Sequence, residues 1–387
     1  MIWSISFAIF LGLIALWIRW RVKMTSVFSN LGVPGPTPSL LFGNLIELYK
    51  KGPLRCHDDW IKEYGKVVGF YEGMKPVLLI AEPELLKSVL MKDFHNFTDR
   101  PEVIPLKGKK EDIFSKELIN LKGQRWKEVR SILTPTFSTA KLKQMTSIIS
   151  HTVDIFISKV KKKSECGEFF DIYDLYQRLT TDVIERTALG MDTGVQEKDH
   201  DPLLQSAQLI FRMKFADPLS FIGLCFPGLR PLAFFLMVIF IRVKNEGYLP
   251  GWRIIEGCEK IINERRADST KRVPDLLQLM LDAEVSRNDL QNITNDKLTA
   301  GNDDVTSDKK SPDHAVDDEQ RKKRSRYMTD DEIKANALIV FLAGYETTSS
   351  ALAYTTYLLA KHPEVQNQVR EELDNHMNDE VSLNCFK

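Results

Sequence analysis

The stretch that decides the fold is ALIVFLAGYETT, residues 337–348. It follows Thr329-Asp-Asp-Glu332, which matches a capping box, in which the threonine side chain accepts from an orphan N–H and the glutamate reaches back. The helical pattern runs to about Lys361, so the sequence predicts a helix about 48 Å long. Residues 337–343 are apolar all round, which predicts burial on every side. A long buried helix is typical of a large, mainly helical domain.

The second half of this stretch departs from the pattern of a buried helix. Gly344 costs a helix about 1 kcal/mol relative to Ala, and Glu346 is costly to bury without partners. Thr347 and Thr348 are mediocre helix formers. One interpretation is a close helix crossing at Gly344, with Thr347 bonded back to the carbonyl of Ala343. The whole run favours a functional site instead, because several unfavourable choices cluster there.

Outside this helix, the patterns predict a small sheet and further helices. Two strand-like runs, residues 66–71 and 76–81, are separated by the turn sequence EGMK. Helical patterns cover residues 121–145, with a break near Pro135, and residues 169–190 and 256–283. The expected fold class is mainly α with a small β-sheet.

The N-terminal segment predicts a membrane anchor. Residues 1–18 carry no charge, and as a helix they would be about 27 Å long, close to the thickness of the hydrocarbon core of a bilayer. Arg19, Arg21 and Lys23 follow the apolar run, whereas a cleaved signal peptide would place its basic residues before it. The positive-inside rule puts the remaining chain on the cytoplasmic side. An uncut transmembrane helix is therefore favoured over a signal peptide.

A second apolar segment leaves two interpretations open. Residues 218–242 contain three prolines and the run LAFFLMVIFI at 232–241, which is too short to span a bilayer. This run is either a buried helix or a helix that lies on the membrane surface.

Composition excludes several classes of function. The 387 residues include 53 basic and 53 acidic side chains, so a global basic footprint for nucleic acid is absent. The five cysteines form no C-x-x-C pair, which argues against a disulfide framework or a structural zinc site. The common glycine-rich nucleotide motifs are also missing.

Three motifs carry a resemblance to a known family. Residues 343–348 (AGYETT) resemble the oxygen-binding motif of the cytochrome P-450 haem-thiolate monooxygenases. Trp126-Lys-Glu-Val-Arg130 is similar to the W-x-x-x-R helix of that family, and Pro34-Gly35-Pro36 to its proline hinge. Residues 125–145 resemble the branch that contains the family 3 drug-metabolising enzymes and thromboxane synthase. The resemblance implies a cytochrome P-450-like fold.

The resemblance also implies a cofactor and a set of site residues. Trp126 and Arg130 would bind a haem b propionate; being four residues apart, they share a helix face, with an indole N–H and a guanidinium as donors. Ala343 and Gly344 would lie beside the cofactor, and the missing side chain of Gly344 would let dioxygen and substrate approach. Thr347 would hydrogen-bond dioxygen, and Glu346 would help to relay protons.

The implied partners are those of a microsomal monooxygenase. Electrons would come from NADPH through a reductase or from a cytochrome b-type donor, and the substrates would be lipophilic: xenobiotics, steroids or fatty-acid-like molecules. Lys122, Arg125 and Lys127 form a candidate basic patch for an acidic reductase surface, with a solvated charged face as the alternative. The expected location is the endoplasmic reticulum membrane. The expected organisation is an anchor (1–20), a basic, proline-rich hinge (21–38) and a catalytic domain (39–387) with a flexible polar linker (301–326).

The sequence departs from the family pattern after the long helix. No arginine follows Arg370, so no later E-x-x-R is present, and no glycine-rich cysteine loop is found. Cys385 has only two residues after it and is not a credible thiolate ligand, because such a ligand needs a closed pocket. No metal ligand is therefore assigned, and the printed chain is expected to be inactive as a monooxygenase. The alternative is a non-catalytic, membrane-anchored helical protein that binds lipophilic ligands or the reductase.

Overall fold

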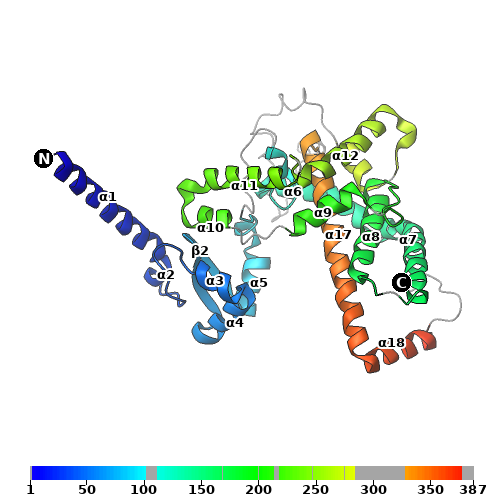
Figure 1. Ribbon diagram of the computed structural model, residues 1–387, viewed down its shortest axis with the longest axis horizontal. Coiled ribbons are helices and arrows are strands. Elements are labelled where there is room, and N and C mark those ends of the chain that lie inside the picture. Colours follow the sequence, from blue (N-terminus) through cyan, green and yellow to red (C-terminus); the bar gives the residue numbers. More distant parts are fainter. Residues whose placement is uncertain are drawn as a thin grey trace, which may run out of the picture. The chain divides into compact units, whose positions relative to one another are not determined.

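The computed structural model describes residues 2–101, 111–167, 169–198, 200–212, 218–245, 247–273, 275–283 and 327–376 (Figure 1). The chain forms two compact units. Unit 1 comprises residues 1–108 and 212–249, and unit 2 comprises residues 109–211 and 250–387. The predicted linker at 301–326 and Cys385 lie outside the described residues.

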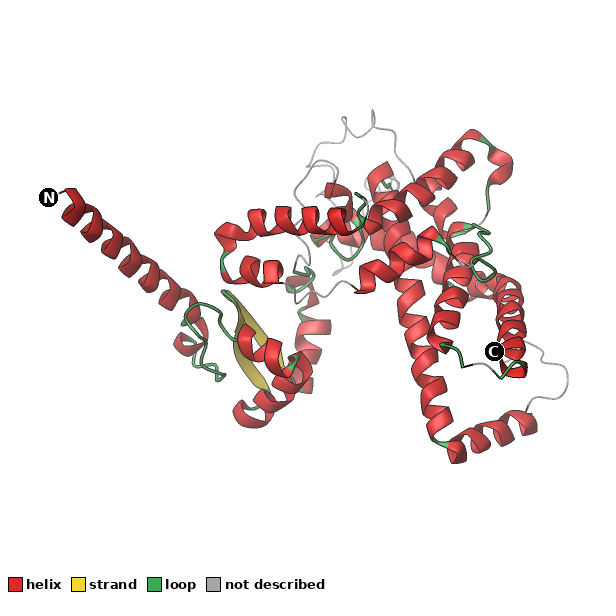
Figure 2. Cartoon of the chain, viewed as in Figure 1, coloured by secondary structure: helices red, strands yellow, loops and turns green. Residues whose placement is uncertain are grey.

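Unit 1 begins with the predicted apolar helix, α1 (Ile2–Thr25), of which Trp3–Thr25 is long and apolar enough to cross a membrane. Short helices α2 (Val27–Asn30), α3 (Leu45–Lys51), α4 (Pro53–Tyr64) and α5 (Pro83–Lys87) follow, and α10 (Pro218–Cys225) and α11 (Arg230–Lys244) complete the unit. The predicted hairpin is confirmed as β1 (Val67–Glu72) and β2 (Lys75–Ile80). The described residues are otherwise helical or irregular (Figure 2).

The hairpin of unit 1 is antiparallel, with Val67 opposite Ile80 and Glu72 opposite Lys75. Gly73 lies in the turn with a φ of 65°, a left-handed conformation that favours glycine. One face of β1 contacts α4, where Trp60 and Phe70 are almost fully buried. This small core needs both the strands and the helix, because a two-stranded hairpin alone is only marginally stable in water.

Unit 2 is built from helices. They are α6 (Gly123–Leu133), α7 (Thr139–Glu165), α8 (Ile172–Ile184), α9 (Pro202–Arg212), α12 (Pro250–Ala267), α13 (Leu276–Asp282), α17 (Asp330–Lys361) and α18 (Pro363–His376). The predicted break near Pro135 is a 3₁₀ segment, Thr134–Phe137. The helix predicted over 256–283 is wrong as one element, because α12 ends at Ala267. Asp268 accepts a hydrogen bond from the Thr270 N–H and starts a separate turn there.

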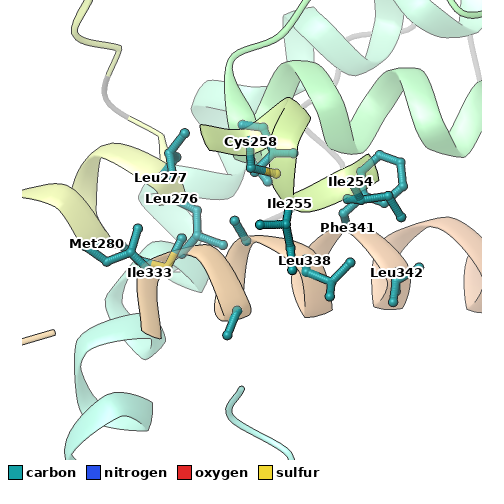
Figure 3. Close-up of a cluster of buried hydrophobic side chains, with 14 of the residues drawn as sticks. Ile254, Ile255, Cys258, Leu276, Leu277, Met280, Ile333, Leu338, Phe341 and Leu342 are labelled. Carbon is teal, nitrogen blue, oxygen red and sulfur yellow. The ribbon is translucent and has the colours of Figure 1, made fainter. Parts of the chain in front are cut away.

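Helix α17 is the predicted long helix, and its capping box is present. The Thr329 side chain accepts from the Glu332 N–H at 3.2 Å, and the Glu332 carboxylate accepts from the Thr329 N–H at 2.8 Å. Its buried residues, among them Ile333, Leu338 and Phe341, pack in one apolar cluster with α12 and α13 (Figure 3).

The expectation that residues 337–343 are buried on every side is wrong for three of the seven. Ala337, Leu338 and Phe341 are buried, Ile339 and Val340 are half-buried, and Ala343 is exposed. Ala343 shares a helix face with Thr347 and Ala351, four and eight residues later, and both are exposed as well. Apolar composition does not show which face of a helix its neighbours leave uncovered.

Candidate functional site

Helix α6 brings Trp126 and Arg130 together as predicted. Trp126 is 8% exposed, and the guanidinium carbon of Arg130 lies 5.4 Å from the centroid of its ring. This is a favourable cation–π distance, and it holds the guanidinium beside the indole. Arg130 itself is exposed. A guanidinium held on an aromatic face, with its fork accessible, is suited to bind a carboxylate or another planar anion.

Arg125, one residue before Trp126, has a structural role that the sequence did not indicate. Its Nε donates to Glu332 Oε1 at 2.7 Å, its Nη1 to Glu128 Oε2 at 2.8 Å, and its Nη2 to the Tyr327 carbonyl at 2.8 Å. These bonds join α6 to the first turn of α17. Although burial opposes it, hydrogen bonding to Arg125 holds the pKa of Glu332 below its ordinary value.

The basic patch expected on α6 therefore changes. The Arg125 guanidinium is occupied by carboxylates and a carbonyl, so it is removed from the candidate reductase surface. Lys122 remains exposed and Lys127 half-buried. Two lysines are a weaker electrostatic signal than three cations, because each exposed charge contributes little on its own.

In the middle of α17, the structure contains both features of the helix-crossing interpretation. Thr347 Oγ1 donates to the carbonyl of Ala343 at 2.7 Å. A Cβ added at Gly344 would lie 2.7 Å from Ile184 Cδ1, so the glycine makes room for α8. The missing side chain of Gly344 thus faces a helix, not an open path for a ligand. Ala343 and Thr347 form the exposed side of this segment.

Glu346 lies on a different side of α17 and has defined partners. Its carboxylate accepts from the Tyr173 hydroxyl and, at 3.5 Å, from the Gln177 side-chain amide, both on α8. Ser350 Oγ, one turn later on α17, donates to it at 3.2 Å. The cost of half-burying this carboxylate is offset by these donors, which resolves the conflict seen in the sequence.

Sequence reasoning missed Tyr173, Gln177 and Ser350. The only signal was spacing: Tyr173 and Gln177 are four residues apart on α8, as Glu346 and Ser350 are on α17. Spacing alone does not show which two helices contact each other. The network extends to α9, where the Gln208 amide donates to Gln177 Oε1 at 2.9 Å.

The predicted site residues therefore fall into two groups. Trp126 and Arg130 lie on α6, which Arg125 ties to Glu332. The second group begins about three turns after Glu332 on α17 and comprises Ala343, Gly344, Glu346 and Thr347. Glu346 and Thr347 are adjacent in sequence but make different bonds, the first to α8 and the second to its own helix.

The cysteines of the described residues do not fit the role of an axial thiolate. Cys258 lies in the apolar core of unit 2, where burial raises the pKa of its thiol to about 12. Burial also raises the pKa of Cys56 and Cys225. Cys166 is exposed at the end of α7. A thiolate ligand needs a lowered pKa, which the three buried cysteines among the described residues do not have, whereas the donors of α6 and α17 fit a propionate and the oxygen side of a haem.

Comparison with known proteins gives a consistent result. The family model described as "Cytochrome P450" matches residues 33–387. Cytochrome P450 3A5 of Homo sapiens is 31% identical over 350 residues, which cover 90% of this chain and 61% of that protein. Cytochrome P450 3A41 of Mus musculus is 30% identical over 370 residues, covering 94% of this chain and 64% of that protein. The chain thus spans about three-fifths of the length of these curated relatives.

Proposed function

Because the chain belongs to the cytochrome P450 family of haem-thiolate monooxygenases, we propose that it takes part in haem-dependent insertion of one oxygen atom from dioxygen into lipophilic substrates. The observation that carries this proposal is the middle of α17. There an exposed hydroxyl, Thr347, lies next in sequence to a carboxylate, Glu346, that is bonded to two further hydroxyls. This is a set of groups that can hold and pass protons beside an accessible helix face.

Each predicted residue has a definite task in this proposal. Bound haem supplies the iron that activates dioxygen. Arg130 would donate a charge-assisted fork to a propionate, and Trp126 would hold the guanidinium in place. The Thr347 hydroxyl, which donates to the Ala343 carbonyl, would be available to hydrogen-bond dioxygen when haem is bound, and the small side chain of Ala343 would keep this helix face apolar. Gly344 contributes indirectly, because it lets α8 approach α17.

Glu346 is the proposed proton-relay residue. Its carboxylate accepts from Tyr173 and Ser350, so a proton can reach it through hydroxyl groups and need not come directly from bulk solvent. A change of side-chain rotamer would then carry the proton from α8 toward Thr347. General acid–base steps of this kind contribute about 10²- to 10⁴-fold to rates.

The proposed setting is the endoplasmic reticulum membrane, with residues 1–20 as anchor, 21–38 as hinge and 39–387 as catalytic domain. Helix α1 is long and apolar enough for the anchor. Electrons would come from NADPH through a reductase or a cytochrome b-type donor. The proposed substrates are lipophilic molecules: xenobiotics, steroids or fatty-acid-like molecules.

The alternative is a non-catalytic protein that binds lipophilic ligands or the reductase. It is favoured by one observation, namely that burial raises the pKa of three of the four described cysteines, Cys56, Cys225 and Cys258. The two functions differ in turnover and not in ligand binding.

One experiment distinguishes the monooxygenase from the non-catalytic protein. The haem-loaded full chain is incubated with reductase, NADPH, ¹⁸O₂ and testosterone as a lipophilic probe. Product that carries one ¹⁸O atom, with the other recovered in water, supports the monooxygenase. A chain that binds haem and testosterone but forms no oxygenated product supports the alternative.

A further inference from the structure

Arg21, near the C-terminal end of α1, is buried in an unusual environment. It is 1% exposed, although residues 3–20 of the same helix are all exposed. Its Nε donates to the Leu40 carbonyl at 2.9 Å, and an Nη donates to the Leu41 carbonyl. Its other Nη donates to the Cys225 carbonyl, 204 residues away in sequence, at 2.8 Å.

Aromatic rings complete this environment. The guanidinium carbon lies 5.5 Å from the Trp17 ring and 5.6 Å from the Phe226 ring. An arginine near the end of a transmembrane helix normally extends its side chain toward the lipid headgroups. Arg21 instead uses its rigid fork to hold protein carbonyls, which a flexible lysine could not match in geometry.

The Cys225 carbonyl belongs to α10, and α10 is itself fixed to the rest of unit 1. A Cβ at Gly73 would lie 2.3 Å from the Leu224 carbonyl, so the hairpin turn packs directly against the end of α10. The ring centroids of Phe42 and Phe221 are 5.5 Å apart. Arg21 therefore connects the anchor helix to α10, which is itself packed against the β1–β2 turn.

Helix α11 packs beside α10 (Figure 1). It presents an apolar face that is exposed. The exposed residues of this face are Leu232, Phe235, Leu236, Ile239, Phe240 and Val243, a spacing that places them on one side of the helix. Arg230 begins the helix, and Arg242 and Lys244 lie in its last turn. Apolar residues flanked by cations are typical of a helix that lies in the membrane interface.

We propose that Arg21 is a joint that fastens the membrane anchor to α10 and thereby holds the apolar face of α11 in the lipid surface next to the anchor. The occupant of that face is lipid, because Arg21 makes the face continuous with a helix that is itself apolar enough to span a bilayer. The inference rests on the proposed membrane anchoring, and it does not depend on haem or on turnover.

Photo-crosslinking of the full chain in phospholipid nanodiscs tests this joint. p-Benzoylphenylalanine is placed at Phe240, and lipid adducts are counted by mass spectrometry. Arg21→Gln, which cannot keep three donor bonds, is expected to lower the adduct yield about tenfold, as for loss of a charge-assisted hydrogen bond. The matched control is Arg19→Gln, which changes an exposed arginine of the same helix and is expected to leave the yield unchanged.

Two further readouts make each outcome decisive. The same probe at Phe10, on α1, should give lipid adducts in every variant; their absence in the unaltered chain would mean that the anchoring itself has failed. Hydrogen exchange at the amides of β1 and β2 reports whether the core of unit 1 persists. Adduct loss at Phe240 with these amides protected supports the joint. Equal adducts in Arg21→Gln, or loss of β1 and β2 protection together with the adducts, would overturn it.

Discussion

Ile184 Cδ1 lies 2.7 Å from the position that a Cβ at Gly344 would occupy. Helices α8 and α17 therefore contact each other where the candidate site residues of α17 begin. The contact explains how a glycine can be tolerated inside a long helix: the helix loses about 1 kcal/mol of propensity, and the close approach lets α8 place Tyr173 and Gln177 against Glu346.

Gly344→Ala is expected to lower the free energy of unfolding by about 1 kcal/mol. Overpacking against Ile184 costs about 1–3 kcal/mol, and the better helix propensity of alanine returns about 1. Urea unfolding of the full chain in detergent measures the change. Ile184→Ala removes both atoms that lie within 3.0 Å, Cδ1 at 2.7 Å and Cγ1 at 2.9 Å. In that background, most of the stability that Gly344→Ala loses in the unaltered chain should be recovered. Without such recovery, the contact with Ile184 would not be the cause.

The bond between Tyr173 and Glu346 is expected to appear as a coupling energy of about 1 kcal/mol. In a double-mutant cycle, Tyr173→Phe and Glu346→Ala are made singly and together, and unfolding is measured for each. The effects should not add, because either change already removes the same hydrogen bond.

Tyr176 gives a matched control for this cycle. It is also a tyrosine on α8, but its hydroxyl bonds to Thr356 and not to Glu346. Tyr176→Phe and Glu346→Ala should therefore add within experimental error. A coupling as large as that of Tyr173 would show that the effect is general to the helix pair and does not report the hydrogen bond.

Glu185 predicts a pH dependence of stability. Its side chain is fully buried, and burial raises its pKa from 4.5 to about 8 despite a hydrogen bond from Thr193. A carboxyl whose pKa is higher in the folded state stabilises the fold fully below its unfolded pKa and loses this contribution as pH rises toward the folded pKa. Glu185 therefore weakens the fold progressively between about pH 4.5 and 8.

Glu185→Gln removes this ionisation and should make the chain more stable than the unaltered protein by about 4 kcal/mol at pH 8. At pH 4.5 the two should differ little. Urea unfolding at both pH values measures the difference, with Glu371→Gln on the exposed helix α18 as control. An advantage of equal size at both pH values would mean that ionisation of Glu185 is not responsible.

Much of the fold follows from local signals in the sequence. The Thr329–Glu332 capping box, the β1–β2 hairpin and the break near Pro135 are visible because each depends on residues close together in the chain. The shared face of Trp126 and Arg130 follows from four-residue spacing in the same way. Two other features do not follow from local signals. The exposure of Ala343 depends on which neighbours cover the helix, and the split between α12 and α13 depends on a single capping aspartate, Asp268.

Contacts between segments that are far apart in the chain could not be predicted from the sequence either. The sequence predicts Arg125 in a basic surface patch, but its guanidinium bonds to Glu332, 207 residues later. Tyr173 meets Glu346 across 173 residues. Only the packing of α6, α8 and α17 brings these residues together, and neither helical periodicity nor motif spacing encodes it.

Arg130 on α6 is proposed to hold the propionate side of a haem. The most direct measurement is a haem titration of the full chain in detergent, followed by Soret absorbance. Arg130→Leu is compared with Arg370→Leu, which changes an exposed arginine on α18. We expect the Kd for haem to rise about tenfold in Arg130→Leu, as for loss of a charge-assisted hydrogen bond, and to stay unchanged in Arg370→Leu. The same Kd in both variants would contradict the assignment of Arg130 to the haem.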